Sequence, residues 1–139
     1  MYKHAYQVLT ALTLFAGLMV PATQAQSIML KAEIPFDFVV GEKRLHSGEY
    51  HVAQINQATT LIQSKDARSS AMVLTTAAQA SKIADAGKLV FNRYGDQYFL
   101  SKIWAASSGM GREFRKSRLE REVAQRLSEG APTVVAAKK

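Results

Sequence analysis

Apolar and polar residues alternate in short runs along most of the chain, which is the pattern of half-buried β-strands. The strongest run is Lys88–Trp104, KLVFNRYGDQYFLSKIW, in which two apolar segments flank the dipeptide Gly95-Asp96. Glycine adopts the positive φ that a two-residue hairpin loop requires, and aromatic residues paired across the strands stabilise such a hairpin. The segment therefore predicts a tight β-hairpin, which we take as the centre of the domain.

Shorter runs before this hairpin predict further strands, with turn residues between them. These runs cover residues 29–34, 36–40, 43–45, 49–55, 60–64 and 70–75. Pro35 separates the first two, because proline cannot donate to a strand ladder. The alanine-rich segment 77–86 predicts a loop or one turn of helix, and residues 105–111 (AASSGMG) predict a flexible loop.

A helical pattern follows near the C-terminus. Ser117 and Glu120 have the spacing of a capping box, in which each side chain accepts a hydrogen bond from the other residue's backbone N–H. Glu122 and Arg126 are spaced for an i,i+4 ion pair. A narrow apolar stripe recurs at every fourth position: Leu119, Val123 and Leu127. The pattern predicts a helix over residues 118–128, which packs on its own sheet or on another chain.

Together these elements predict an all-β domain with a C-terminal helix. The expected architecture is a small antiparallel β-sandwich or partly open barrel of about seven short strands. We divide the chain into a targeting segment (1–25), a β-domain (26–111), a helix segment (112–129) and a frayed tail (130–139). The predicted core consists of Phe36, Phe38, Val40, Tyr50, Val52, Leu61, Val73, Leu89, Phe91, Leu100 and Trp104.

The first 25 residues have the pattern of a cleaved signal peptide. A weakly basic start at Lys3 precedes an uncharged apolar run over residues 8–20, and Pro21 ends that run. Small residues then precede Gln26, before which we expect cleavage. The apolar run is shorter than the about 20 residues that a membrane-spanning helix needs. The sequence therefore predicts export to the periplasm or the extracellular space, with no transmembrane span in the mature chain.

Charge and cysteine content narrow the chemistry. The chain contains no cysteine, which excludes disulfides, thiolate nucleophiles and thiolate metal sites. Its formal net charge is +7, spread along the sequence. A basic surface attracts anionic partners. In an exported protein these are phospholipid headgroups, acidic glycans or wall polymers, and nucleic acid is not an expected partner.

Residues that could carry catalysis or hold a metal do not form a recognisable motif. His46, Glu49 and His51 are of the ligand type, but a predicted turn separates His46 from the other two, and zinc needs three or four convergent ligands. The serine in the loop motif Ser108-Gly109-Met110-Gly111 has no histidine near it in sequence, and no Gly-x-Ser-x-Gly elbow occurs. We therefore predict no metal, no cofactor and no catalytic residues.

The tip of the central hairpin is the predicted binding site. Arg93, Tyr94, Asp96 and Tyr98 combine aromatic and charged side chains at a loop tip, a composition that is common in binding sites and also in stable turns. The sequence favours a non-enzymatic envelope or secreted module that binds an envelope protein, a glycan or an apolar ligand. The alternative is a small exported hydrolase, which a pocket with convergent acids or a His–acid pair would favour.

Three segments carry a resemblance to a known group of proteins. They are Ile34–Gly41 (IPFDFVVG), Leu89–Leu100 (LVFNRYGDQYFL) and Lys116–Glu122 (KSRLERE). Together they resemble a family of small exported bacterial proteins of unknown function. The resemblance implies an exported single domain and brings no activity, cofactor or site residue.

Overall fold

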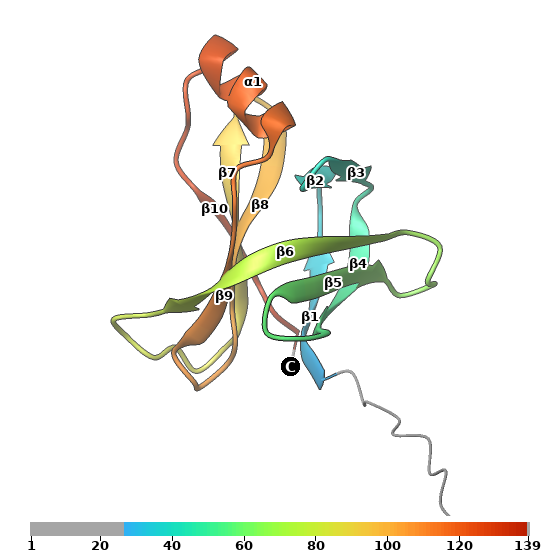
Figure 1. The fold of residues 1–139 in the computed structure, drawn as a ribbon, viewed down its shortest axis with the longest axis vertical. Coiled ribbons are helices and arrows are strands. Elements are labelled where there is room, and N and C mark those ends of the chain that lie inside the picture. The colour runs from blue at the N-terminus through green and yellow to red at the C-terminus, as the bar shows by residue number, and fades with distance from the viewer. Residues whose placement is uncertain (1–26, 139) are drawn as a thin grey trace, which may run out of the picture.

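The computed structural model describes residues 27–138, and these form a mostly β structure with one short helix near the C-terminus (Figure 1). The predicted fold class, all-β with a C-terminal helix, is confirmed. The predicted targeting segment and its cleavage position lie outside the described residues.

Ten strands and one helix make up the described part of the chain. In order they are β1 (Ser27–Ile34), β2 (Phe38–Val40), β3 (Lys43–Leu45), β4 (Gly48–Gln54), β5 (Thr59–Ser64), β6 (Ser70–Gln79), β7 (Lys88–Tyr94), β8 (Gln97–Trp104), β9 (Met110–Phe114), α1 (Arg118–Arg126) and β10 (Thr133–Ala136).

The long strand β6 links two halves of one bent sheet, and Figure 1 shows it crossing between them. Its first half pairs with β5, from Ser70 to Leu74, and its second half pairs with β9, from Thr75 onward. The order β1-β4-β5-β6-β9-β8-β2-β3 is completed by β7, which pairs with β8, and by β10, which pairs with β7. All pairings are antiparallel except the single β2–β8 contact between Val39 and Phe99. The sheet is mixed and does not close on itself.

The predicted central hairpin is confirmed as β7 and β8. Tyr94 pairs with Gln97, so Gly95 and Asp96 form a two-residue turn. Gly95 has a φ of +63°, the conformation for which glycine was expected. Strand β8 also contacts β9 and β2 along its other edge, which makes the hairpin the structural centre of its half of the sheet.

The main core lies between the two halves of the sheet. Seven of the predicted core residues are buried there: Phe38, Val40, Tyr50, Val52, Leu89, Phe91 and Leu100. Phe36 and Val73 are partly buried against this cluster. The prediction was wrong for Leu61 and Trp104, which are only half-buried. In β5 the inward positions are Thr60 and Ile62, so Leu61 lies on the opposite face.

Thr60 is buried because it belongs to a polar network at the bend of β6. Arg112 of β9 is only 6% exposed, and its Nε donates to the Thr75 hydroxyl at 3.0 Å. Its Nη2 donates to the carbonyls of Thr75 and Gln57. The Thr60 and Thr75 hydroxyls are 2.9 Å apart. The network joins β5, β6 and β9 and satisfies a buried guanidinium without a carboxylate.

Several boundaries differ from the prediction. Residues 77–79 belong to β6 rather than to a loop, and the segment 112–129 begins as strand β9 before α1 starts at Arg118. The glycines in AASSGMG indicated flexibility, but Gly111 is part of β9. The helix ends at Arg126 instead of residue 128.

The C-terminal segment 130–139 was expected to fray, yet residues 133–136 form β10. This strand pairs with the outer edge of β7, with Val134 opposite Val90. Beyond it, the Lys138 N–H donates to the Lys31 carbonyl at 2.8 Å, and the Lys138 ammonium lies 2.8 Å from Glu49 and 2.9 Å from Glu33. The tail therefore connects the two halves of the sheet, and Figure 1 places the C-terminus beside β1.

Candidate functional site

Helix α1 packs on its own hairpin, and a buried carboxylate holds it there. Ser117 is the N-cap, and its hydroxyl accepts from the Glu120 N–H at 3.1 Å, as the capping box predicts. The Glu120 side chain instead faces the hairpin. It is 3% exposed, and its Oε1 accepts from Asn92 Nδ2 at 2.7 Å and from the Tyr94 hydroxyl at 3.1 Å. Only half of the predicted capping box is therefore formed.

A second, smaller apolar cluster lies under the helix. It consists of the buried residues Val39, Tyr94, Phe99 and Val123, with Leu119 packed against them. Two of the three predicted stripe residues, Leu119 and Val123, therefore join this cluster. Leu127 is the C-cap, is 41% exposed, and lies beside Gly95 in the hairpin turn. This packing places the start of α1 close to the β2–β3 turn, where the Glu42 carboxylate accepts from the Arg118 N–H at 2.9 Å.

The predicted site at the hairpin tip is divided between surface and core. Tyr94 is 1% exposed and packs under α1, so it does not belong to the surface. Arg93 and Tyr98 do lie together, with the guanidinium 5.6 Å from the centre of the Tyr98 ring. Tyr98 in turn stacks on Phe36, with ring centres 3.9 Å apart. Asp96 is exposed in the turn. These contacts show that the side chains of the tip pack on one another and on Phe36, as in a stable turn. The predicted binding role of the tip is not tested by them.

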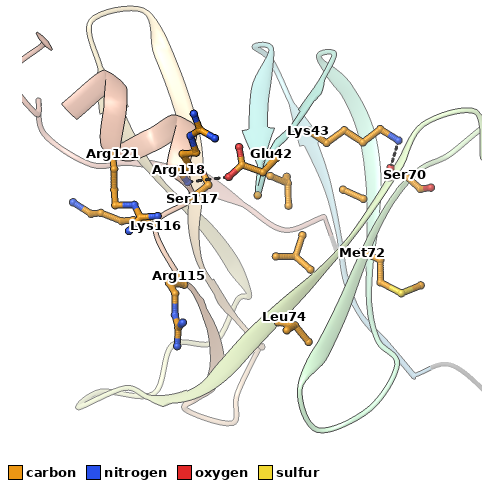
Figure 2. A pocket seen from close by; sticks show the side chains of 14 residues that line it. Glu42, Lys43, Ser70, Met72, Leu74, Arg115, Lys116, Ser117, Arg118 and Arg121 are labelled. Atoms are coloured by element: carbon orange, nitrogen blue, oxygen red, sulfur yellow. Dashed lines mark hydrogen bonds between the residues drawn. The ribbon is translucent and has the colours of Figure 1, made fainter. Parts of the chain in front are cut away.

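A groove that the sequence analysis did not predict lies between α1 and β6 (Figure 2). Its volume is about 780 Å³. Three segments far apart in sequence form it: the β2–β3 turn, the first half of β6, and residues 115–121. It opens where β9 has ended: Phe114 pairs with Thr75, and no strand of residues 27–138 pairs with the second edge of residues 70–74.

The lining of this groove is strongly basic. Its charged side chains are five cations and one carboxylate: Lys43, Arg115, Lys116, Arg118, Arg121 and Glu42. Figure 2 shows four of the cations grouped on the helix side, with β6 on the other side. Within the described part of the chain, Arg115 and Arg121 have no side-chain hydrogen bond or ion pair. Both guanidinium groups are therefore available to a ligand.

The remaining cations have partners. Arg118 pairs with Glu122 at 3.1 Å, in place of the predicted Glu122–Arg126 pair. The Lys43 ammonium donates to the Ser70 carbonyl across the groove. Lys116 donates to the Tyr94 hydroxyl at 3.3 Å, and this hydrogen bond raises the pKa of Lys116 above its usual value. Lys116 therefore stays protonated at neutral pH, and its ammonium also forms an ion pair with Glu129 at 3.7 Å.

The floor of the groove is apolar. Val40, Ala71 and Val73 line it, and all three belong to the main core or pack against it. Gly41 has a φ of +61°, which favours glycine in the β2–β3 turn, and the turn lies over the Val73 side chain of β6. Met72 and Leu74 are 65% and 73% exposed at the border of the groove. The site thus combines a basic wall with an apolar base.

The histidines lie in a separate, exposed region. His46 Nδ1 is 3.5 Å from Asp37, with side-chain exposures of 84% and 52%, and His51 Nε2 is 4.0 Å from Glu49. A hydrogen bond from the Ser47 N–H lowers the pKa of Asp37. Among residues 27–138, no group of three His, Asp or Glu side chains has the arrangement of a metal site. Within residues 27–138, the partner of each histidine ring is a carboxylate, and neither ring is hydrogen-bonded to a serine hydroxyl.

Comparisons with known proteins do not assign the chain to a family. No family model matches it, and neither does any curated protein or solved structure. Within residues 27–138, α1 is too short and too polar to cross a membrane. The function therefore has to be argued from the geometry and charge of the groove.

Proposed function

We propose that the protein is an exported, non-enzymatic binding module whose basic groove holds an anionic amphiphile. By this we mean a small molecule with a carboxylate or phosphate group joined to an apolar body. The observation that carries the proposal is the combination of five basic side chains and an apolar floor in one groove of about 780 Å³. This volume is within the range of small-molecule sites.

The basic wall suits the anionic group. Arginine presents planar N–H donors that match carboxylate and phosphate oxygens in pairs. Arg115 and Arg121 supply such donors, and the N-terminus of α1 adds the positive end of the helix dipole. The Glu42 carboxylate already accepts a hydrogen bond from the Arg118 N–H. A carboxylate is thus accommodated beside the helix N-terminus, and because Glu42 occupies this N–H, a ligand anion would use the guanidinium groups of Arg115 and Arg121.

The floor suits the apolar part of such a ligand. Val73 is half-buried and presents aliphatic carbon to the groove, whereas Val40 and Ala71 are only 1% and 6% exposed. Most of the exposed apolar surface comes from Met72 and Leu74 at the border of the groove. Covering apolar surface contributes about 0.8 kcal/mol for each methylene removed from water. A purely ionic ligand would leave this floor exposed, and a purely apolar ligand would leave the arginines without an anion. A molecule with both parts uses the whole lining.

The test is a calorimetric titration of the protein with dodecyl phosphate, below its critical micelle concentration. The comparison ligand is dodecyl maltoside, which has the same chain and an uncharged head. We expect saturable binding of the phosphate that is about tenfold tighter than binding of the maltoside. The double variant Arg115→Ala/Arg121→Ala should lose most of this difference.

The matched control removes two positive charges outside both the groove and the Trp104 cavity, as Lys31→Ala/Arg44→Ala, and should bind dodecyl phosphate like the unchanged protein. Equal loss in both double variants would show that net charge attracts the ligand and that the groove has no specific role. Equal affinity for the two head groups would contradict the anionic part of the proposal.

A further inference from the structure

We infer that this protein carries a second binding site, for an acidic sugar, built on Trp104 at the other end of the sheet. Trp104 is the only tryptophan in the chain. It pairs with Gly111 of β9, and a Cβ at Gly111 would lie 2.5 Å from ring atom Cε3. Only glycine leaves room for the indole ring there, so the ring is held against the β9 backbone. The loops beside it lie at the end of the molecule away from α1 (Figure 1).

Lysines surround this ring. Lys88 is directly opposite Trp104 on β7, and Lys102 precedes it by two residues on β8. Cross-strand partners and residues two apart share one face of a sheet. Lys82, from the loop after β6, completes the set. These four side chains line one cavity of about 380 Å³.

The cavity is positively charged because three lysines line it and, among the residues that the structure describes, no carboxylate does. Glu113 is opposite Lys102 on β9 and so shares its face of the sheet, and Asp85 is in the loop after β6, but neither lines the cavity. Neither forms an ion pair with the three lysines in the part of the chain that the structure describes. The polar residues Gln79 and Ser81 also line the cavity. The site thus presents an aromatic ring, three cations and neutral hydrogen-bonding groups.

This set of groups matches the chemistry of a sugar acid. A pyranose ring has a face of C–H groups that packs on an aromatic ring, and its hydroxyls need neutral polar partners. Its carboxylate would pair with the lysine ammonium groups. A volume of about 380 Å³ is near the lower limit for small-molecule sites and suits a short oligosaccharide. A single-stranded nucleic acid would need several stacking residues along a track, and this cavity has one aromatic ring.

The single tryptophan makes the site directly measurable. The experiment is a fluorescence titration of the whole protein with trigalacturonate, with maltotriose as the neutral sugar and an oligothymidylate as the nucleic acid. We expect a saturable change in emission with trigalacturonate and binding of maltotriose that is about tenfold weaker or undetectable. An equal response to both sugars, or tighter binding of the oligothymidylate, would overturn the proposal.

Variants assign the binding to these residues. Lys88→Ala/Lys102→Ala should weaken trigalacturonate binding by about tenfold or more. The matched control Lys31→Ala/Arg44→Ala removes two charges outside both binding sites and should leave this affinity unchanged. The loop variant Lys82→Ala, which leaves both strands intact, should weaken binding even if the double variant does not fold. Undiminished binding in the folded lysine variants would overturn the site, whatever the groove binds.

Discussion

The carboxylate of Glu120 should be the main polar contact that fixes α1 to the hairpin. The informative change is Glu120→Ala, with Glu120→Gln as its control. Alanine removes the acceptor of two hydrogen bonds and leaves the Tyr94 hydroxyl and the Asn92 amide without it. Glutamine keeps a carbonyl oxygen that can accept both hydrogen bonds and removes only the charge.

The magnitude follows from the burial of the two donors. A buried donor left without its acceptor costs about 1–3 kcal/mol. Tyr94 is 1% exposed and should approach this cost, whereas the half-buried Asn92 amide can be partly satisfied by water. Glu120→Ala also removes the free-energy cost of burying a charged carboxylate, and this offsets part of the loss. We expect Glu120→Ala to lower the free energy of unfolding by about 2 kcal/mol, and Glu120→Gln by less than about 1 kcal/mol.

Urea unfolding followed by circular dichroism measures both changes. With a slope of about 1–2 kcal/mol per molar urea, the alanine variant should unfold at a midpoint about 1–2 M lower. A double-mutant cycle with Asn92→Ala should give a coupling free energy of at least about 0.5 kcal/mol, because the two side chains share a hydrogen bond. Equal losses for alanine and glutamine, together with zero coupling, would refute the assigned role of these hydrogen bonds.

Three further predictions follow from other contacts. Glu42→Ala frees the α1 N-terminus and removes the acidic residue of the groove, so calorimetry should show about two- to fivefold tighter binding of dodecyl phosphate. The hydrogen bond from Lys138 lowers the pKa of Glu49 in the folded protein. The stabilisation from the Glu49 carboxylate is therefore present above its ordinary pKa of about 4.3 and is lost as the pH falls below that value. The difference in unfolding free energy between Glu49→Gln and the unchanged protein should shrink between about pH 5 and pH 3. Gly111→Ala places a methyl group against the Trp104 ring and should cost about 2 kcal/mol in urea unfolding, with a change in tryptophan emission; unchanged stability would contradict the close packing.

Elements with local signals were predictable from the sequence. The hairpin was predicted because its turn glycine, its aromatic residues and its alternation are all adjacent in the chain. The start of α1 was predicted because Ser117 supplies the cap from the neighbouring position. The orientation of the Glu120 side chain was not, because its partners Asn92 and Tyr94 come from the distant hairpin.

Elements that depend on distant contacts were missed. Strand β9 contains Gly111 next to a loop whose composition indicated flexibility. Glycine is needed in this strand because a Cβ would clash with the Ile103 carbonyl oxygen and with the Trp104 ring. Arg112 lay in a segment predicted to be helical, yet its partners are Thr75 and Gln57, which are remote in sequence. Strand β10 follows a proline and gains order from the free edge of β7.

The binding groove was missed for the same reason, since three remote segments form it. The one local signal was the basic run from Arg115 to Arg121, which the sequence analysis assigned to the helix segment alone. At the hairpin tip, alternation places Arg93 and Tyr98 on one face and Tyr94 on the other, under the helix. A future test of the tip should therefore change Arg93 or Asp96, because replacing Tyr94 would disturb the core.

The most direct test of the central claim, that the groove is the ligand site, is an amide chemical-shift titration with dodecyl phosphate. If the claim is right, the largest shifts will cluster at Gly41, at residues 71–73 and at residues 115–121, with little change at the hairpin tip. Shifts concentrated at residues 93–98, or spread evenly over the basic surface, would contradict it.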